Sequence, residues 1–220
     1  MGLAGTGGAG REHLMFKRRA PRVERLLPLF PLHTVLFPGG LLPLKVFEQR
    51  YIEMTKACTA SGEPFGVCLI VKGDEVARGD NPQPPDFAPI GTLARIVDWD
   101  MQDGVLHLRA EGGERFQVRS HARKPDGLVM GTVVSIANEP ALPLPAAYQP
   151  LAKLLDALAQ RVGPSHFPAP HAFDDASWVG YRLAELMPLP LSVKQTMLEI
   201  NDGDVRLAVL AKFLQQHGLL

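Results

Sequence analysis

A short glycine-rich motif near the start of the sequence has the spacing of a dinucleotide-binding fingerprint. Its residues are Gly5-Thr6-Gly7-Gly8-Ala9-Gly10. Such a motif binds a pyrophosphate only where a strand ends in a tight turn at a helix N-terminus, with an acidic residue about 20 positions further on. The four residues before the motif are too few for that strand, and no βαβ pattern follows it. The motif therefore predicts a flexible leader and no nucleotide cofactor.

Motifs for ATP binding and for nucleophilic catalysis are missing from the sequence. A phosphate-binding loop needs a Gly-Lys pair, and the sequence contains none. None of the six serines lies in Gly-x-Ser-x-Gly or Ser-x-x-Lys, although distant residues could still form a Ser–Lys pair. Cys58 lies toward the end of a predicted helix, where the helix dipole raises the pKa of a thiol. We predict that the chain is not an enzyme.

Metal-ligating residue types gather in one polar cluster, formed by His166, His171, Asp174 and Asp175. The two histidines are five positions apart with two prolines between them, so a helix cannot present both on one face as a zinc motif requires. We expect an exposed loop there and no metal. Asp98 and Asp100 flank Trp99 near a turn, and we expect both carboxylates to be solvated.

The charge of the chain is zero only as a sum. Residues 1–27 carry six basic and two acidic side chains, and residues 28–220 therefore have a net charge of −4. A basic tail can contact nucleic acid, but an acidic body weakens that attraction. We predict no DNA partner, and we rank RNA behind polypeptides as a partner.

Two further features bear on the cellular environment. The apolar stretch 26–44 contains four prolines and a Gly-Gly pair, which would break a membrane-spanning helix, so we predict no membrane insertion. Cys58 and Cys68 are too few for a disulfide framework. Both observations favour a cytoplasmic protein.

The elements that must position these residues are predicted to be short, because 41 of the 220 residues are Gly or Pro. We expect a first pair of strands around a Pro-Gly turn, a short helix, a buried strand, an exposed loop over 73–89, and then an antiparallel meander that curls into a barrel. In chain order the predicted strands are 26–30, 42–47, 65–72, 90–99, 104–110, 115–123 and 128–137, and the helix is 48–60. The predicted turns of the meander are Asp103-Gly104 and Pro125-Asp126-Gly127.

A helical region is predicted after the Pro-rich segment 142–145, because apolar residues then recur with the helical period. Asp174 or Asp175, a capping box at Ser192–Gln195, and Asp204 are the predicted N-terminal signals. The expected helices are 151–162, 175–187, 192–201 and 205–216. The predicted fold is thus α+β, with a basic leader (1–25), a β-rich subdomain with one short helix (26–142), and a helical subdomain (143–220).

Ordered apolar motifs are spread over residues 26–216. They are Leu26-Leu27-Pro28-Leu29-Phe30-Pro31-Leu32, Val35-Leu36-Phe37-Pro38-Gly39, Leu42 to Tyr51, Ile90-Gly91-Thr92-Leu93-Ala94, Glu111 to Phe116, and Trp178 through Leu186-Met187-Pro188-Leu189-Pro190 to Leu198. In order and spacing they resemble the N-terminal substrate-binding domain of ATP-dependent Lon proteases. The resemblance implies a bent, PUA-like β-barrel followed by a small helical bundle.

The same resemblance implies a function. In Lon proteases this domain helps to hold unfolded or damaged polypeptides for an ATPase and a Ser-Lys protease, and the sequence contains the motifs of neither. We therefore predict a stand-alone, non-enzymatic polypeptide-binding or adaptor module, with a separate protease or ATPase as a second candidate partner. An RNA-binding PUA-like protein and a small hydrolase with an unrecognised site are the alternatives.

The Pro-Gly turn and the helix after it are the predicted binding region. The candidate residues are apolar or exposed polar side chains: Phe37, Phe47, Gln49, Arg50, Glu53 and Lys56. The alternative interpretation makes Phe47 a core residue and the four polar side chains an ordinary solvated helix face.

Overall fold

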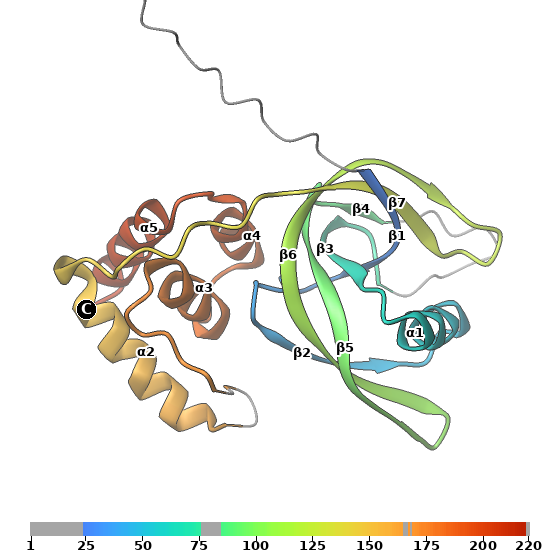
Figure 1. Cartoon of the computed structure of the whole chain (residues 1–220), viewed down its shortest axis with the longest axis horizontal. Coiled ribbons are helices and arrows are strands. Elements are labelled where there is room, and N and C mark those ends of the chain that lie inside the picture. The colour runs from blue at the N-terminus through green and yellow to red at the C-terminus, as the bar shows by residue number, and fades with distance from the viewer. Residues whose placement is uncertain (1–23, 76–84, 165–166, 168, 219–220) are drawn as a thin grey trace, which may run out of the picture.

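The computed structural model describes residues 24–75, 85–164, 167 and 169–218. Figure 1 shows a β-barrel with one helix beside it and a separate group of helices packed against the other side. This arrangement confirms the predicted α+β class. The predicted leader lies largely outside the described residues, but its last two residues, Glu24 and Arg25, are the first two of strand β1.

The barrel is formed by five strands that pair in a ring. Along the sheet the neighbours are β1, β7, β6, β5 and β3, and β3 pairs with β1 again, which closes the ring. All of these pairings are antiparallel except β1 with β3, which is parallel and was not predicted. The strands are β1 (Glu24–Leu32), β2 (Leu41–Val46), β3 (Phe65–Lys72), β4 (Asp86–Phe87), β5 (Ile90–Gln102), β6 (Val105–Arg123) and β7 (Val129–Ser135).

The meander β5-β6-β7 is confirmed, with both predicted turns. Asp103 and Gly104 have positive φ angles of 49° and 78°, as a tight hairpin turn requires. The two predicted strands 104–110 and 115–123 are in fact the single strand β6. Gly112 lies within this strand and does not end it. It allows the Phe37 backbone to approach the strand closely, since a Cβ at position 112 would lie 2.1 Å from the Phe37 carbonyl oxygen.

Strand β2 does not pair with β1, so the prediction of a first hairpin is wrong. Both edges of β1 are already used by β7 and β3. β2 instead pairs antiparallel with β6, from Leu41 opposite Glu111 to Val46 opposite Leu106. It therefore lies at an edge of the sheet.

Helix α1 (Gln49–Ser61) is confirmed and packs on the barrel through its apolar side. Its buried residues are Tyr51, Ile52, Met54, Thr55 and Cys58. The predicted exposed loop 73–89 is only partly correct, since β4 pairs with β3 and Ala88 is buried. Residues 76–84 of that loop lie outside the described residues.

The C-terminal part consists of a short 3-10 turn and four helices. These are η1 (Ala146–Tyr148), α2 (Gln149–Val162), α3 (Ala176–Leu186), α4 (Leu191–Glu199) and α5 (Gly203–Gln216). None of the helices in the described part of the chain is long and apolar enough to cross a membrane.

The helix starts were predicted with mixed success. Asp175 caps α3 as predicted, accepting a hydrogen bond of 2.6 Å from the Trp178 amide. Helix α5 is capped by Asp202 and not by Asp204. The predicted capping box at Ser192 is wrong, because α4 begins at Leu191 and Gln195 donates to the Ile90 carbonyl of the barrel, 2.9 Å away.

The helices and the barrel share one apolar core and one buried ionic cluster. Phe37 is completely buried among helix residues, and Arg182 of α3 donates to the Pro38 and Gly39 carbonyls at 2.8 Å each. The carboxylate of Glu139 lies between Arg115 of β6 and Arg206 of α5. These contacts hold the two parts against each other.

Candidate functional site

The two aromatic residues predicted for binding lie in opposite environments. The Phe37 side chain is fully buried, with its ring centroid 5.9 Å from that of Tyr181, so it is a core residue and cannot contact a ligand. Phe47 is 60% exposed, which excludes the alternative interpretation that it belongs to the core. The difference follows from position: the turn that contains Phe37 is covered by α3, whereas Phe47 follows directly after the edge strand β2.

The four polar candidates on α1 also divide into two kinds. Gln49, Glu53 and Lys56 are exposed, and both Gln49 and Lys56 donate to the Glu53 carboxylate, at 2.7 and 2.9 Å. Exposed pairs of this kind contribute little to stability, so the three side chains are free to exchange partners. Their role in binding stays a prediction.

Arg50 is different, because its contacts are made within the protein. Its guanidinium pairs with the Glu48 carboxylate at 2.7 Å, donates to the Gly127 carbonyl at 3.1 Å, and lies 4.7 Å from the centre of the Tyr51 ring. Arg50 therefore fixes the start of α1 against the β6–β7 turn.

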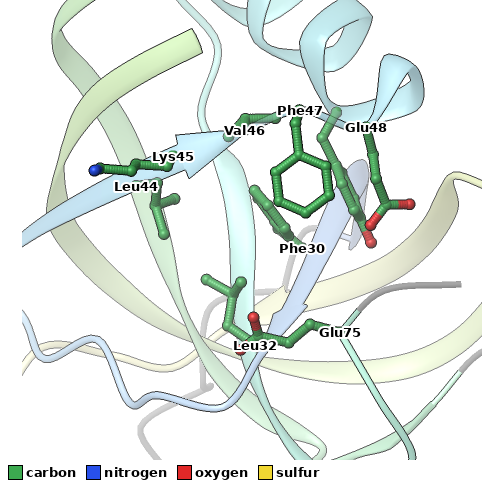
Figure 2. A pocket seen from close by; sticks show the side chains of 9 residues that line it. Phe30, Leu32, Leu44, Lys45, Val46, Phe47, Glu48 and Glu75 are labelled. Atoms are coloured by element: carbon green, nitrogen blue, oxygen red, sulfur yellow. The ribbon is translucent and has the colours of Figure 1, made fainter. Parts of the chain in front are cut away.

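A pocket of about 190 Å³ lies where β2 ends and α1 begins. Figure 2 shows the Phe47 side chain over the space that Phe30 and Leu32 of β1 line. Apolar side chains dominate the wall, with one cation and two carboxylates among the lining residues. The lining residues are Phe30, Leu32, Leu44, Lys45, Val46, Phe47, Glu48, Tyr51 and Glu75.

The ionisable groups of this pocket, here called the Phe47 pocket, are not poised for catalysis. Burial raises the pKa of Tyr51 to about 12, and its ring is stacked on Phe30 with centroids 3.9 Å apart. Burial also raises the pKa of Glu48, although the adjacent Arg50 opposes the shift. Glu75 accepts a hydrogen bond from the His33 backbone amide. The Tyr51 phenol is neutral at pH 7, so it acts as part of the apolar wall.

A second hollow adjoins the first and was missed by the sequence analysis. This groove, of about 400 Å³, lies around Trp99 on the β5–β6 hairpin and shares Leu44 and Lys45 of β2 with the Phe47 pocket. Trp99 is 53% exposed. Asp98 and Asp100 are exposed as expected, and the large apolar residue between two solvated acids was the signal that could have identified the groove.

A third hollow shares no lining residue with the first two and lies between the start of β1, α1 and the β6–β7 turn. It has a volume of about 460 Å³ and includes Leu26, which is 70% exposed. No aromatic residue is among the described residues that line it. It therefore serves below as a comparison surface.

Neither cysteine is activated as a nucleophile, because burial raises the pKa of both thiols. Burial raises the pKa of the Cys68 thiol to about 12, and burial together with the Glu63 charge raises that of Cys58. No group of three or more His, Cys, Asp and Glu side chains in the described part of the chain could hold a metal ion. His171 packs against the rings of Phe167, Phe173 and Trp178, while His166 lies outside the described residues.

Comparison with known proteins gives a consistent result. The model of the ATP-dependent protease La (LON) substrate-binding domain matches residues 26–216. The Lon protease of Koribacter versatilis is 29% identical over 198 residues, which are 83% of this chain and 23% of that protein. The Lon protease of Escherichia coli K12 is 23% identical over 211 residues, or 91% of this chain and 26% of that protein. The chain thus spans about a quarter of the length of these relatives.

Two solved structures of Lon N-terminal domains are also similar to this chain. The Lon N-terminal domain protein from Xanthomonas campestris is 36% identical, with a TM-score of 0.70, over 86% of this chain and 98% of that one. The N-terminal domain of the Mycobacterium avium complex Lon protease is 16% identical, with a TM-score of 0.58, over 88% and 100% of the two chains. The second similarity concerns the fold alone.

Proposed function

The chain belongs to the family of the ATP-dependent protease La (Lon) substrate-binding domain, and from that premise we propose that it binds unfolded or extended polypeptide segments at the Phe47 pocket. The observation that supports this site best is the exposed Phe47 ring beside a hollow with apolar walls. In protein interfaces a few side chains in well-packed pockets near the centre, often aromatic ones, supply most of the binding energy. Unfolded chains expose the apolar side chains that such a hollow accepts.

The charges around the pocket favour a polypeptide over a nucleic acid. Two carboxylates, Glu48 and Glu75, and one ammonium, Lys45, line it. Arg50, which lies beside the pocket, is already paired with Glu48. Phosphate groups need a surplus of basic side chains, so RNA is the weaker candidate.

The proposed role is that of a binding module without an activity of its own. The matching family model describes a substrate-binding domain and includes neither the ATPase nor the protease domain. We propose that residues 26–142 carry the binding site and that residues 143–220 support it. As a cytoplasmic adaptor, the protein would deliver the bound segment to a separate ATPase or protease.

Binding can be measured with a model protein kept unfolded by reduction and carboxymethylation of its cysteines, labelled for fluorescence anisotropy. The wild-type protein should bind the unfolded form and not its native form. Phe47→Ala should weaken binding about 10-fold, or roughly 1–2 kcal/mol, as truncation of an interface aromatic does. Leu26→Ala is the matched control, since it removes another exposed apolar side chain, which belongs to the third hollow, and should leave the affinity unchanged.

Two outcomes would contradict this proposal. One is that the wild-type protein binds the native and the unfolded form of the model protein equally well, because the site would then not recognise exposed apolar segments. The other is a loss of affinity in Leu26→Ala but not in Phe47→Ala, which would move the site to the third hollow.

A further inference from the structure

The part of the leader before β1, residues 1–23, lies outside the described residues and is strongly basic. It has five basic side chains and one acidic one, a net charge of +4: Arg11, Lys17, Arg18, Arg19 and Arg22 against Glu12. Four of the basic residues lie between positions 17 and 22, and Phe16 directly precedes them. An aromatic side chain followed by cations complements an apolar hollow that contains an uncompensated carboxylate.

The cation of the Phe47 pocket lies on the far side of β2 from the cavity. Lys45 is the one cation among the described residues that line the pocket. Side chains alternate between the two faces of a strand, so Lys45 lies on the opposite face from Leu44 and Val46. The partners of Leu44 and Val46 on β6 are buried, so Lys45 is on the outer face of the sheet. Figure 2 accordingly shows the Lys45 ammonium pointing away from the Phe47 ring.

One of the two carboxylates in the pocket has no Lys or Arg partner. Glu48 is paired with the Arg50 guanidinium at 2.7 Å. Glu75 accepts a hydrogen bond from the His33 amide and lies 3.5 Å from the Nδ1 atom of the same residue, but no Lys or Arg side chain within the described residues pairs with it. The Glu75 side chain is 41% exposed, so a cation on a bound segment can reach it.

The distance along the chain allows Phe16 to reach this pocket. The pocket lies beside Phe30, whereas the leader joins β1 at Glu24. The six residues from Glu24 to Phe30 span about 20 Å at roughly 3.3 Å per residue. A chain that turns back at Glu24 covers about 26 Å over the eight residues to Phe16, which is enough to return to the pocket. Ala20 and Val23, the aliphatic residues in between, are too close to β1.

The third hollow is closer to the leader but has the wrong charge for it. Two cations, Arg25 and Lys124, are among its lining residues, against the single carboxylate of Glu63. Glu63 is already paired with Arg25 at 3.0 Å, so the surplus charge is positive. Like charges facing each other across an interface are unfavourable. A basic segment is therefore expected to favour the Phe47 pocket over the third hollow.

We propose that the leader occupies the Phe47 pocket of its own chain, with Phe16 beside the Phe47 ring and the basic residues 17–19 beside Glu75. The leader thereby competes with unfolded polypeptide segments and weakens their binding to the full chain. Because it is tethered, its effective concentration at the pocket is about millimolar, so weak contacts fill the pocket for part of the time. This inference rests on the proposed function and concerns the regulation of the same site.

Substitutions in the full chain test the competition, with the carboxymethylated model protein as the probe. Phe16→Ala should tighten binding about 3-fold or more, because a pocket that its own leader fills for two-thirds of the time binds with one-third of its intrinsic affinity. Arg18→Glu combined with Arg19→Glu should do the same. Leu3→Ala is the matched control, since it removes an apolar leader residue that no basic run follows, and it should leave the affinity unchanged. In a Phe47→Ala background, Phe16→Ala should have no effect.

Photo-crosslinking locates the leader independently of polypeptide binding. The full chain with benzoylphenylalanine in place of Phe16 should, at low protein concentration, form a crosslink within one chain to residues that line the Phe47 pocket, as mapped by mass spectrometry. The same group in place of Leu3 should not. Glu75→Gln should lower the crosslinking yield several-fold, and so should about 0.5 M salt, because the contact with the basic residues is electrostatic.

The outcomes distinguish this inference from the proposed function. If neither the wild-type protein nor Phe16→Ala binds unfolded polypeptide, the proposed function fails, while the crosslink still tests the position of the leader. A crosslink from position 16 to the third hollow, or to a second copy of the chain, overturns the inference. Equal affinities of the wild type and Phe16→Ala for the model protein also overturn it, and a loss of affinity in Phe47→Ala would then leave the proposed function standing.

Discussion

Replacement of Glu139 should destabilise the protein more than any surface substitution, because this carboxylate is paired with two buried guanidinium groups. Its side chain is 5% exposed, and those of Arg206 and Arg115 are 0% and 3% exposed. Ser177 and Tyr181 also donate to it, at 2.6 and 2.8 Å. Glu139→Leu therefore leaves two buried cations without their counter-ion and two buried hydroxyls without their acceptor.

The size of the effect follows from these contacts. Removing one partner of a buried ion pair costs about 3–5 kcal/mol. With a urea dependence of about 2 kcal/mol per molar, the unfolding midpoint of Glu139→Leu should fall by roughly 1.5–2.5 M. Glu53→Leu is the matched control on α1, where the lost ion pair with Lys56 is exposed and contributes at most about 1 kcal/mol.

The assay is urea unfolding at pH 7, followed by circular dichroism, for the two variants and for Glu139→Leu combined with Arg206→Met. The double variant should regain part of the loss, because it removes one of the two stranded charges. A midpoint shift for Glu139→Leu no larger than that for Glu53→Leu would refute the reasoning.

The decrease in the free energy of unfolding at acidic pH offers a second measurement on Glu139. Burial raises the pKa of this carboxyl, but the hydrogen bonds from Arg206 and Ser177 and the charge of Arg206 outweigh it, so the pKa lies below its usual value. A carboxyl with a lowered pKa stabilises the fold above its unfolded pKa of about 4.3, and the contribution is lost as the pH falls through the folded value. The wild-type protein should lose this contribution below about pH 4, whereas Glu139→Gln should not.

The remaining predictions concern close packing and titration. Gly112→Ala should destabilise the protein by about 1–3 kcal/mol in urea unfolding, because the new Cβ meets the Phe37 carbonyl. Gly113→Ala is the control: its Cβ would lie 3.6 Å from the nearest atom, so it should cost less than about 1 kcal/mol. Equal effects of the two substitutions would contradict the close approach at Gly112. The Tyr51 phenol should ionise near pH 12, which is measured as the part of the absorbance change at 295 nm that is missing in Tyr51→Phe. The free energy of unfolding should fall as the pH rises from about 10 toward that value, because only the neutral phenol is stable in the buried site. Titration of this absorbance near pH 10 in the folded protein would refute the burial of the phenol.

The parts of the fold that were predicted correctly depend on local signals. Asp103-Gly104 specifies its own turn through two positive φ angles, and Asp175 is adjacent to the helix that it caps. The periodicity of α1 is likewise contained in its own residues. These features are set by neighbours within a few positions, which the sequence presents directly.

The errors concern contacts between distant parts of the chain. The partner of β2 is β6, some 65 residues further on, and nothing within β2 identifies it. No local sequence signal distinguishes Phe37 from Phe47 as a buried residue, and only the packing of α3 over Phe37 makes it part of the core. The Trp99 groove was missed for the same reason, since two of its walls belong to β2 and β6.

The closed ring of strands has a consequence for the newly made chain. β1 pairs with β7 over a long stretch, beginning with Glu24 opposite Val134, so the barrel cannot close until β7 has been synthesised. At about 5–20 residues per second the ribosome needs roughly 5–20 s to extend the chain from β1 to β7. Until then the segment 24–29 of β1, which includes the core residues Leu27 and Leu29, lacks its β7 partner. A protein proposed to bind unfolded segments thus passes through a state that exposes apolar segments of its own.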